Sequence, residues 1–132
     1  ASASADDKPV AEIAVHTLMG EIAQRSGKLD EAATHYKAAI TTEDAGLYFE
    51  PPTWYYPVRH SLGVVLLEQG HADQAEAVYR EDLKRFPENG WSLFGLMQAQ
   101  RAQGKTKEAA ETDKRFRKAW KDADVTLTAS RF

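Results

Sequence analysis

The side chains in this sequence that could do chemistry begin with its histidines. There are four of them, His16, His35, His60 and His71. Their spacing puts no two imidazoles on one face of a single helix, and no HExxH motif of a zinc enzyme is present. His60 alone has neighbours that could tune a general base, namely Glu50, Tyr56 and Arg59. Because no nucleophile motif or phosphate-binding glycine loop accompanies it, the sequence predicts no catalytic residue, no metal ligand, no cofactor and no enzyme activity.

A basic run at residues 114–121, KRFRKAWK, raises the question of nucleic acid binding. On a helix, Phe116 and Trp120 lie four residues apart and share one face, so the charges occupy the remaining sides. Nearby acidic residues partly offset those charges: Glu108, Glu111, Asp113, Asp122 and Asp124. This pattern is typical of a solvated outer face with two aromatic rings turned toward the body. We therefore expect no nucleic acid partner.

The composition is that of an ordinary globular domain. The 132 residues carry a net charge of −3, with 42% hydrophobic and 28% charged residues, so no strong field attracts DNA. The absence of cysteine excludes disulfides and thiolate metal sites. No apolar run approaches the roughly 18 residues of a transmembrane helix, so we expect a soluble chain with no membrane partner, in the cytoplasm or the periplasm. Residues 1–8 are small or polar and are expected to be disordered.

The strongest signal is an internal repeat marked by three glycines. These are Gly27, Gly70 and Gly104. Seven residues before them stand Gly20, Gly63 and Met97, five residues after them stand Ala32, Ala75 and Ala109, and nine residues after them stand Tyr36, Tyr79 and Asp113. Small residues let two helices approach closely, and an aromatic ring fills the space between one hairpin and the next. The spacing therefore predicts a stack of helical hairpins.

This pattern resembles the tetratricopeptide repeat, a helix-turn-helix unit with a period of about 34 residues. The middle repeat matches it through Gly63, Gly70, Ala75, Tyr79 and Pro87, and the third repeat is degenerate at Met97 and Asp113. The resemblance implies an all-α fold, a right-handed superhelical stack of three repeats. We place them at about 9–42, 53–87 and 89–122, within a solenoid at 9–124 followed by a tail at 125–132. Residues 50–132 also look like the closing segment of longer bacterial repeat proteins, which implies the C-terminal portion of one.

Apolar stripes and caps indicate how the helices are expected to lie. The first helix, from Pro9 to Arg25, is predicted to bury a stripe of four apolar residues, Ile13, Leu18, Met19 and Ile22. Pro87 should end the fourth helix, and Asn89 should cap the fifth. We expect the tail to pack across the last helix or to serve as a terminus.

An aromatic insertion separates the first two repeats. Gly27 and Gly70 are 43 residues apart while Gly70 and Gly104 are 34 apart, so nine extra residues fall in the stretch TTEDAGLYFEPPTWYYP. Its rings cannot all be left in water. Either they plug the gap beside the first hairpin, or some of them form one wall of a ligand groove, with Trp54, Tyr55, Tyr56 and Arg59 as the wall. A small-molecule site bounded by Trp54, Tyr56 and His60 is a further alternative.

The resemblance also implies which residues line a concave face, because the first helix of each repeat forms it in that family. The positions so nominated are Glu21, Arg25, His60, Val64, Leu67, Trp91, Phe94, Gln98 and Arg101. The alternative is that Trp91 and Phe94 are covered by the tail or by the insertion. The Lys, Asn and Arg set that clamps a C-terminal carboxylate in some members is absent, since the matching positions hold Thr17 and Glu21, His60 and Val64, and Phe94 and Gln98.

These observations predict a protein or peptide-binding scaffold of unidentified partner, with a groove that suits a helix or an extended peptide. The alternative from a different class is a structural cap or self-assembly unit of a longer repeat array.

Overall fold

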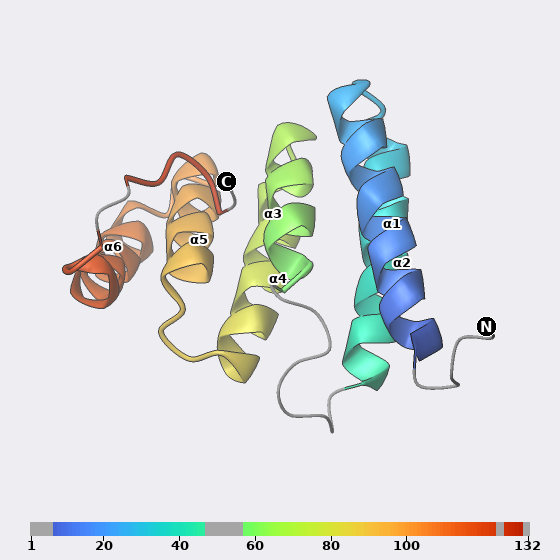
Figure 1. Cartoon of the computed structure of the whole chain (residues 1–132). Coiled ribbons are helices and arrows are strands. Elements are labelled where there is room, and N and C mark those ends of the chain that lie inside the picture. The colour runs from blue at the N-terminus through green and yellow to red at the C-terminus, as the bar shows by residue number, and fades with distance from the viewer. Residues whose placement is uncertain (1–6, 47–56, 124–125, 131–132) are drawn as a thin grey trace. The chain divides into compact units, whose positions relative to one another are not determined.

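The computed structural model describes residues 7–46, 57–123 and 126–130, and in these residues it contains six α-helices and no strand (Figure 1). The helices are α1 (Asp7–Arg25), α2 (Leu29–Ala45), α3 (Arg59–Glu68), α4 (Ala72–Arg85), α5 (Gly90–Ala102) and α6 (Thr106–Trp120). The prediction of an all-α fold is confirmed. Contacts divide the chain into two compact units, unit 1 (Ala1–Val58) and unit 2 (Arg59–Phe132). Within the described ranges, no helix has the length and apolar character needed to cross a membrane.

The three glycines that mark the repeat form equivalent turns. Gly27, Gly70 and Gly104 have φ values of 77°, 82° and 76°, in the left-handed region that glycine adopts without a side-chain clash. The residue after each glycine donates its amide to a carbonyl five residues earlier: Lys28 to Ala23 at 2.8 Å, His71 to Leu66 at 2.8 Å and Lys105 to Gln100 at 2.9 Å. The same closure at three places in the chain confirms the predicted hairpin register.

Unit 1 is the hairpin of α1 and α2, held together by a close approach at Gly20. A Cβ atom on Gly20 would lie 2.6 Å from Cε1 of Tyr36, whose side chain is fully buried. The small residue therefore lets the ring of α2 reach the backbone of α1.

The predicted buried stripe of α1 was wrong for three of its four residues. Ile13 is buried, but Leu18, Met19 and Ile22 are 58%, 45% and 57% exposed. The side of α1 that packs inward carries smaller residues at helical spacing, Ile13, Thr17, Gly20 and Ala23. Small residues permit the close approach of α2, so the bulkier stripe lies on another side of the helix.

Unit 2 contains two hairpins, α3 with α4 and α5 with α6. Tyr79 of α4 lies between the first helices of both, because a Cβ atom on Gly63 of α3 or on Gly95 of α5 would lie 2.2 Å from its Cζ atom. The predicted role of the repeat aromatic, filling the space between hairpins, is thus confirmed for Tyr79. The Asn89 side chain accepts from the Ser92 amide at 3.2 Å, which confirms the cap of α5.

Candidate functional site

The chain's own residues 126–130 lie against α3 and α5 in a non-helical conformation. Gln98 of α5 donates from Nε2 to the carbonyl oxygen of Thr128 at 3.1 Å. Ser130 donates its hydroxyl to the carbonyl oxygen of His60 at 2.9 Å. Leu127 is 9% exposed and Ser130 is fully buried. The tail therefore makes its hydrogen bonds with the first helices of both hairpins, α3 and α5. The sequence predicts instead that it packs across the last helix or serves as a terminus.

Tyr79 identifies the side of the helices on which this segment lies. Its ring enters from α4, and its far end sits against both Gly63 and Gly95. The phenolic oxygen lies 2.6 Å from the Ser130 hydroxyl. Ser130 is therefore on the side of α3 and α5 that faces away from α4. We call this side the inner surface and define it by Val64, Leu67, Trp91, Phe94, Gln98 and Arg101, with the His60 carbonyl and the Tyr79 hydroxyl at its edge.

The direction of the hydrogen bonds at Ser130 follows from the groups present. A carbonyl oxygen can only accept, so the Ser130 hydrogen points to His60, and the Tyr79 hydroxyl must donate to Ser130. Burial raises the pKa of the Tyr79 phenol well above its usual value; the hydrogen bond with Ser130 opposes this rise and the charge of Asp82 adds to it. The phenol therefore stays protonated and available as a donor.

The side chain of His60 does not lie on the inner surface. Its Nε2 atom is 2.9 Å from Oδ2 of Asp82, and the Ser92 hydroxyl donates to the same oxygen. These three residues come from α3, α4 and α5, and all are buried. The serine contacts the carboxylate instead of the imidazole, so the group lacks the serine-to-histidine contact that activates a nucleophile. It is a polar link between three helices, and it corrects the placement of the His60 side chain in a groove.

The other positions on α3 and α5 that the sequence assigns to the concave face are partly or fully exposed. Val64 and Leu67 are partly exposed on α3, Trp91, Phe94 and Gln98 are partly exposed on α5, and Arg101 is exposed. Glu21 is half-buried and Arg25 is exposed in unit 1, which is described by itself. Arg59 is 7% exposed, so it does not present an open wall. Trp54, Tyr55 and Tyr56 lie outside the described residues, and with them the alternatives for the insertion.

Trp91 and Phe94 pack against rings of α6. Trp91 lies edge-on to Trp120 with centroids 5.4 Å apart, and Phe94 is 5.3 Å from Phe116. Phe116 and Trp120 in turn stack at 5.8 Å. The two rings of α6 turn toward the body of unit 2, as predicted. There they contact Trp91 and Phe94, whereas the alternative predicted from the sequence was that only the tail or the insertion covers these two residues.

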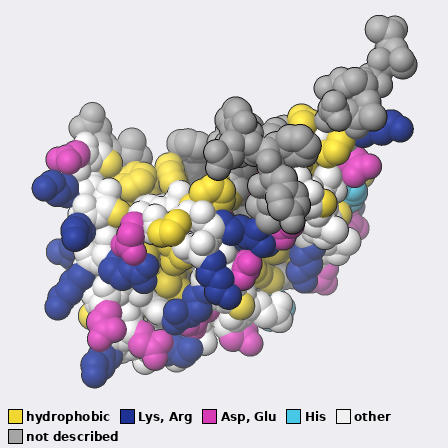
Figure 2. All heavy atoms as spheres, turned by 90° about the horizontal axis from the view of Figure 1, so that it is seen from below, with side chains coloured by type: hydrophobic (Ala, Val, Ile, Leu, Met, Phe, Trp, Pro, Cys, Tyr) yellow, Lys and Arg dark blue, Asp and Glu magenta, His cyan; other side chains and the backbone are white. Residues whose placement is uncertain are grey.

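The basic run on α6 is partly paired with acidic groups. Arg115 lies 2.7 Å from Glu88, and Arg117 lies 3.0 Å from Asp113. On the face drawn in Figure 2, basic and acidic side chains are interspersed. The ion pairs of Arg115 and Arg117, with the exposure of the basic side chains of this run, support the expectation that it is a solvated surface.

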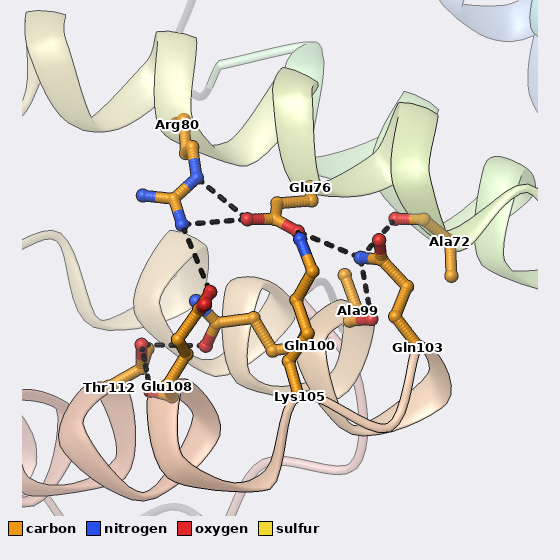
Figure 3. Close-up of polar contacts among 9 residues, drawn as sticks. All are labelled: Ala72, Glu76, Arg80, Ala99, Gln100, Gln103, Lys105, Glu108 and Thr112. Carbon is orange, nitrogen blue, oxygen red and sulfur yellow. Dashed lines mark hydrogen bonds and ion pairs between the residues drawn. The ribbon is translucent and has the colours of Figure 1, made fainter.

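A charge network around the buried Glu76 carboxylate joins α4 to the turn between α5 and α6 (Figure 3). Glu76 accepts from Lys105 Nζ and Gln103 Nε2, each at 2.8 Å, and pairs with Arg80 at 2.7 Å. Burial alone would raise the pKa of Glu76, but the hydrogen bonds from Lys105, Arg80 and Gln103 outweigh it and lower the pKa to about 2. The only feature of the sequence that could have indicated this network is the i, i+4 spacing of Glu76 and Arg80.

His16 and His35 meet across unit 1, with their Nδ1 atoms 3.2 Å apart. The two histidines lie on different helices, α1 and α2, so helical spacing along the sequence could not predict this contact. No group of three or more potential metal ligands occurs among the residues that the structure describes.

Comparison with known proteins agrees with this architecture. A family model described as "Tetratricopeptide repeat" matches residues 60–124, which covers α3 to α6. The human protein "Tetratricopeptide repeat protein 7A" is 30% identical over 94 residues, which is 71% of this chain. The chain spans only 10% of the length of that relative.

Proposed function

Because the chain belongs to the tetratricopeptide repeat family of protein-interaction scaffolds, we propose that unit 2 binds a segment of a protein partner on its inner surface. The observation that carries this proposal is the segment already lying there. Residues 126–130 adopt a non-helical path across α5 and α3, and Gln98 accommodates a main-chain carbonyl of that path. A surface that holds one non-helical segment through main-chain and hydroxyl contacts has the chemistry to hold another.

The character of the inner surface fits a peptide with one or two apolar anchors. Val64 and Leu67 supply apolar area on α3, the rings of Trp91 and Phe94 supply it on α5, and Arg101 adds a charge at one end. Partly exposed aromatic and aliphatic side chains with polar groups at the margin are the usual composition of such sites. The proposal includes no catalytic step.

Affinity capture from a lysate of the source cell tests the proposal. Val64→Glu places a charge in the middle of the inner surface and should reduce recovery of the bound partner by about tenfold or more. Lys118→Glu changes an exposed residue of α6 and is the control. Both variants should keep the wild-type circular dichroism spectrum. Full recovery with folded Val64→Glu would refute binding at this surface.

A second candidate function, self-association, is favoured by the exposed stripe of α1. Val15, Leu18, Met19 and Ile22 follow the i, i+3, i+4, i+7 spacing of one helix face and are all about half exposed. The occupant that we propose is a second copy, because a twofold axis would place the same apolar stripe against itself. Sedimentation velocity at several concentrations should show a dimer that Leu18→Glu abolishes. Strictly monomeric wild-type protein would exclude it.

A further inference from the structure

The segment 126–130 has the geometry of a bound ligand that is covalently attached to its own site. It meets the helices of unit 2 through three separable features: the buried side chain of Leu127, the main-chain carbonyl of Thr128 and the buried hydroxyl of Ser130. Thr126, which precedes these contacts, and the side chain of Thr128, which lies between them, are exposed. The surface therefore recognises an aliphatic residue that is followed three positions later by a small hydroxyl residue.

The hydroxyl is required because two polar groups converge on it. The Tyr79 hydroxyl donates to Ser130, and Ser130 donates to the His60 carbonyl. A single atom that both accepts and donates satisfies the two groups at once, whereas a methyl group would leave the Tyr79 hydroxyl without an acceptor and would remove the bond to the His60 carbonyl, which otherwise has only its partner within α3. Leaving a buried donor or acceptor without a partner is unfavourable, so the site should reject an alanine at this position. The full burial of Ser130 leaves no room for a phosphate group.

Unit 1 shows that an equivalent tyrosine does not need such a segment. Tyr36 stands at the position of Tyr79, and its hydroxyl donates to Gln24 Oε1 at 3.1 Å within its own hairpin. The position of Gln24 is occupied by Leu67 in unit 2, 43 residues later. Leucine cannot accept a hydrogen bond, so the Tyr79 hydroxyl is left for a group that approaches from the inner surface.

We infer that residues 126–130 are an exchangeable occupant of the inner surface, and that the partner presents a non-helical segment of the form Leu-x-x-Ser, or a close aliphatic and hydroxyl equivalent, in their place. This inference rests on the proposed function and adds the chemical pattern of the partner and its competitor. Five residues separate Trp120 at the end of α6 from Thr126. A linker this short gives an effective concentration on the order of 1 mM. The resident segment competes at this concentration. A peptide with an intrinsic Kd of about 100 µM would therefore bind wild-type protein about tenfold more weakly than it binds a protein whose inner surface is unoccupied.

The test uses a fluorescent synthetic peptide with the sequence of residues 125–132, VTLTASRF, titrated into the full chain. Ser130→Ala in the protein weakens the resident segment and leaves the surface intact, so the added peptide should bind about fivefold to tenfold more tightly than it binds wild type. Thr126→Ala changes an exposed residue of the same segment and should leave the affinity unchanged. Circular dichroism confirms that each variant is folded.

Two modified peptides test the pattern. Replacing the serine at position 130 of the peptide by alanine, or by phosphoserine, should abolish measurable binding to the Ser130→Ala protein. If the alanine peptide binds as well as the serine peptide, the requirement for a hydroxyl is refuted. If no peptide binds the Ser130→Ala protein up to about 1 mM, the segment is a fixed part of the fold and the inference fails. The Val64→Glu capture experiment reports on the proposed function independently, because it measures a partner and not the exchange of residues 126–130.

Discussion

The replacement of Glu76 by glutamine gives the sharpest test of how the two hairpins of unit 2 are joined. Glu76 belongs to α4, while Gln103 and Lys105 belong to the turn between α5 and α6. The carboxylate is 9% exposed and its contacts to Lys105 and Gln103 cross from one hairpin to the next. Glutamine keeps the size of the side chain and removes the charge, so the variant isolates the ionic contribution.

The expected magnitude follows from the pKa of the carboxyl group. Burial opposes ionisation, but the hydrogen bonds from Lys105, Arg80 and Gln103 lower the pKa of Glu76 from 4.5 to about 2. A shift of this size corresponds to about 3 kcal/mol of stability at neutral pH. Arg80 and Lys105 are 51% and 41% exposed, so solvent screens them, and we expect about 1–2 kcal/mol.

The direction in which stability changes with pH follows from the lowered pKa of Glu76. Because the pKa is lower in the folded protein, the stabilisation is complete above about pH 4.5 and is lost as the pH falls toward 2. Urea unfolding at pH 7, 4.5 and 3 should therefore show a difference between wild type and Glu76→Gln that shrinks as the pH falls. Glu108→Gln, at an exposed carboxylate 3.9 Å from Arg80, is the control and should cost less than about 0.5 kcal/mol. Equal losses for Glu76→Gln at pH 7 and pH 3 would refute the ionic origin.

Three further substitutions separate backbone, packing and polar contributions, each measured by urea unfolding. Gly63→Ala should lower the free energy of unfolding by about 1–3 kcal/mol, because its Cβ would lie 2.2 Å from the Tyr79 ring; no loss would mean that the ring can move. Gly70→Ala has open space around its Cβ and should lose only the cost of its left-handed backbone, about 1 kcal/mol, so a larger loss would contradict the turn geometry. Asp82→Ala leaves His60 Nε2 without its buried acceptor and should cost about 2–3 kcal/mol, whereas a neutral effect would show that water replaces the carboxylate.

The parts of the fold that the sequence predicts are those determined by local geometry. Gly27, Gly70 and Gly104 occur where the backbone needs a positive φ. Gly20 and Gly63 occur where an aromatic ring needs space. Each requirement involves residues within one hairpin at constant spacing, so the repeat in the sequence reproduces the repeat in space.

The parts that the sequence does not predict depend on partners distant in the chain. Asp82 is a polar residue on an amphipathic helix, and its burial becomes favourable only with His60, 22 residues before it, and Ser92, 10 residues after it. Ser130 meets Tyr79 across 51 residues. The exposed stripe of α1 was missed for a related reason, since periodicity identifies an apolar face without identifying which neighbour covers it.

The different surroundings of Tyr36 and Tyr79 connect the fold to the proposed exchange, and they can be tested by one pair of substitutions. Leu67→Gln would give unit 2 the acceptor that Gln24 provides for Tyr36 in unit 1. The Tyr79 hydroxyl would then have a partner within its own hairpin, and Ser130 would matter less for stability. In a double-mutant cycle measured by urea unfolding, Ser130→Ala should therefore cost about 0.5–1 kcal/mol less in the Leu67→Gln background than in wild type. Strict additivity would show that Leu67 is not equivalent to Gln24 in space, and the argument that one leucine opens this tyrosine to an outside hydroxyl would fail.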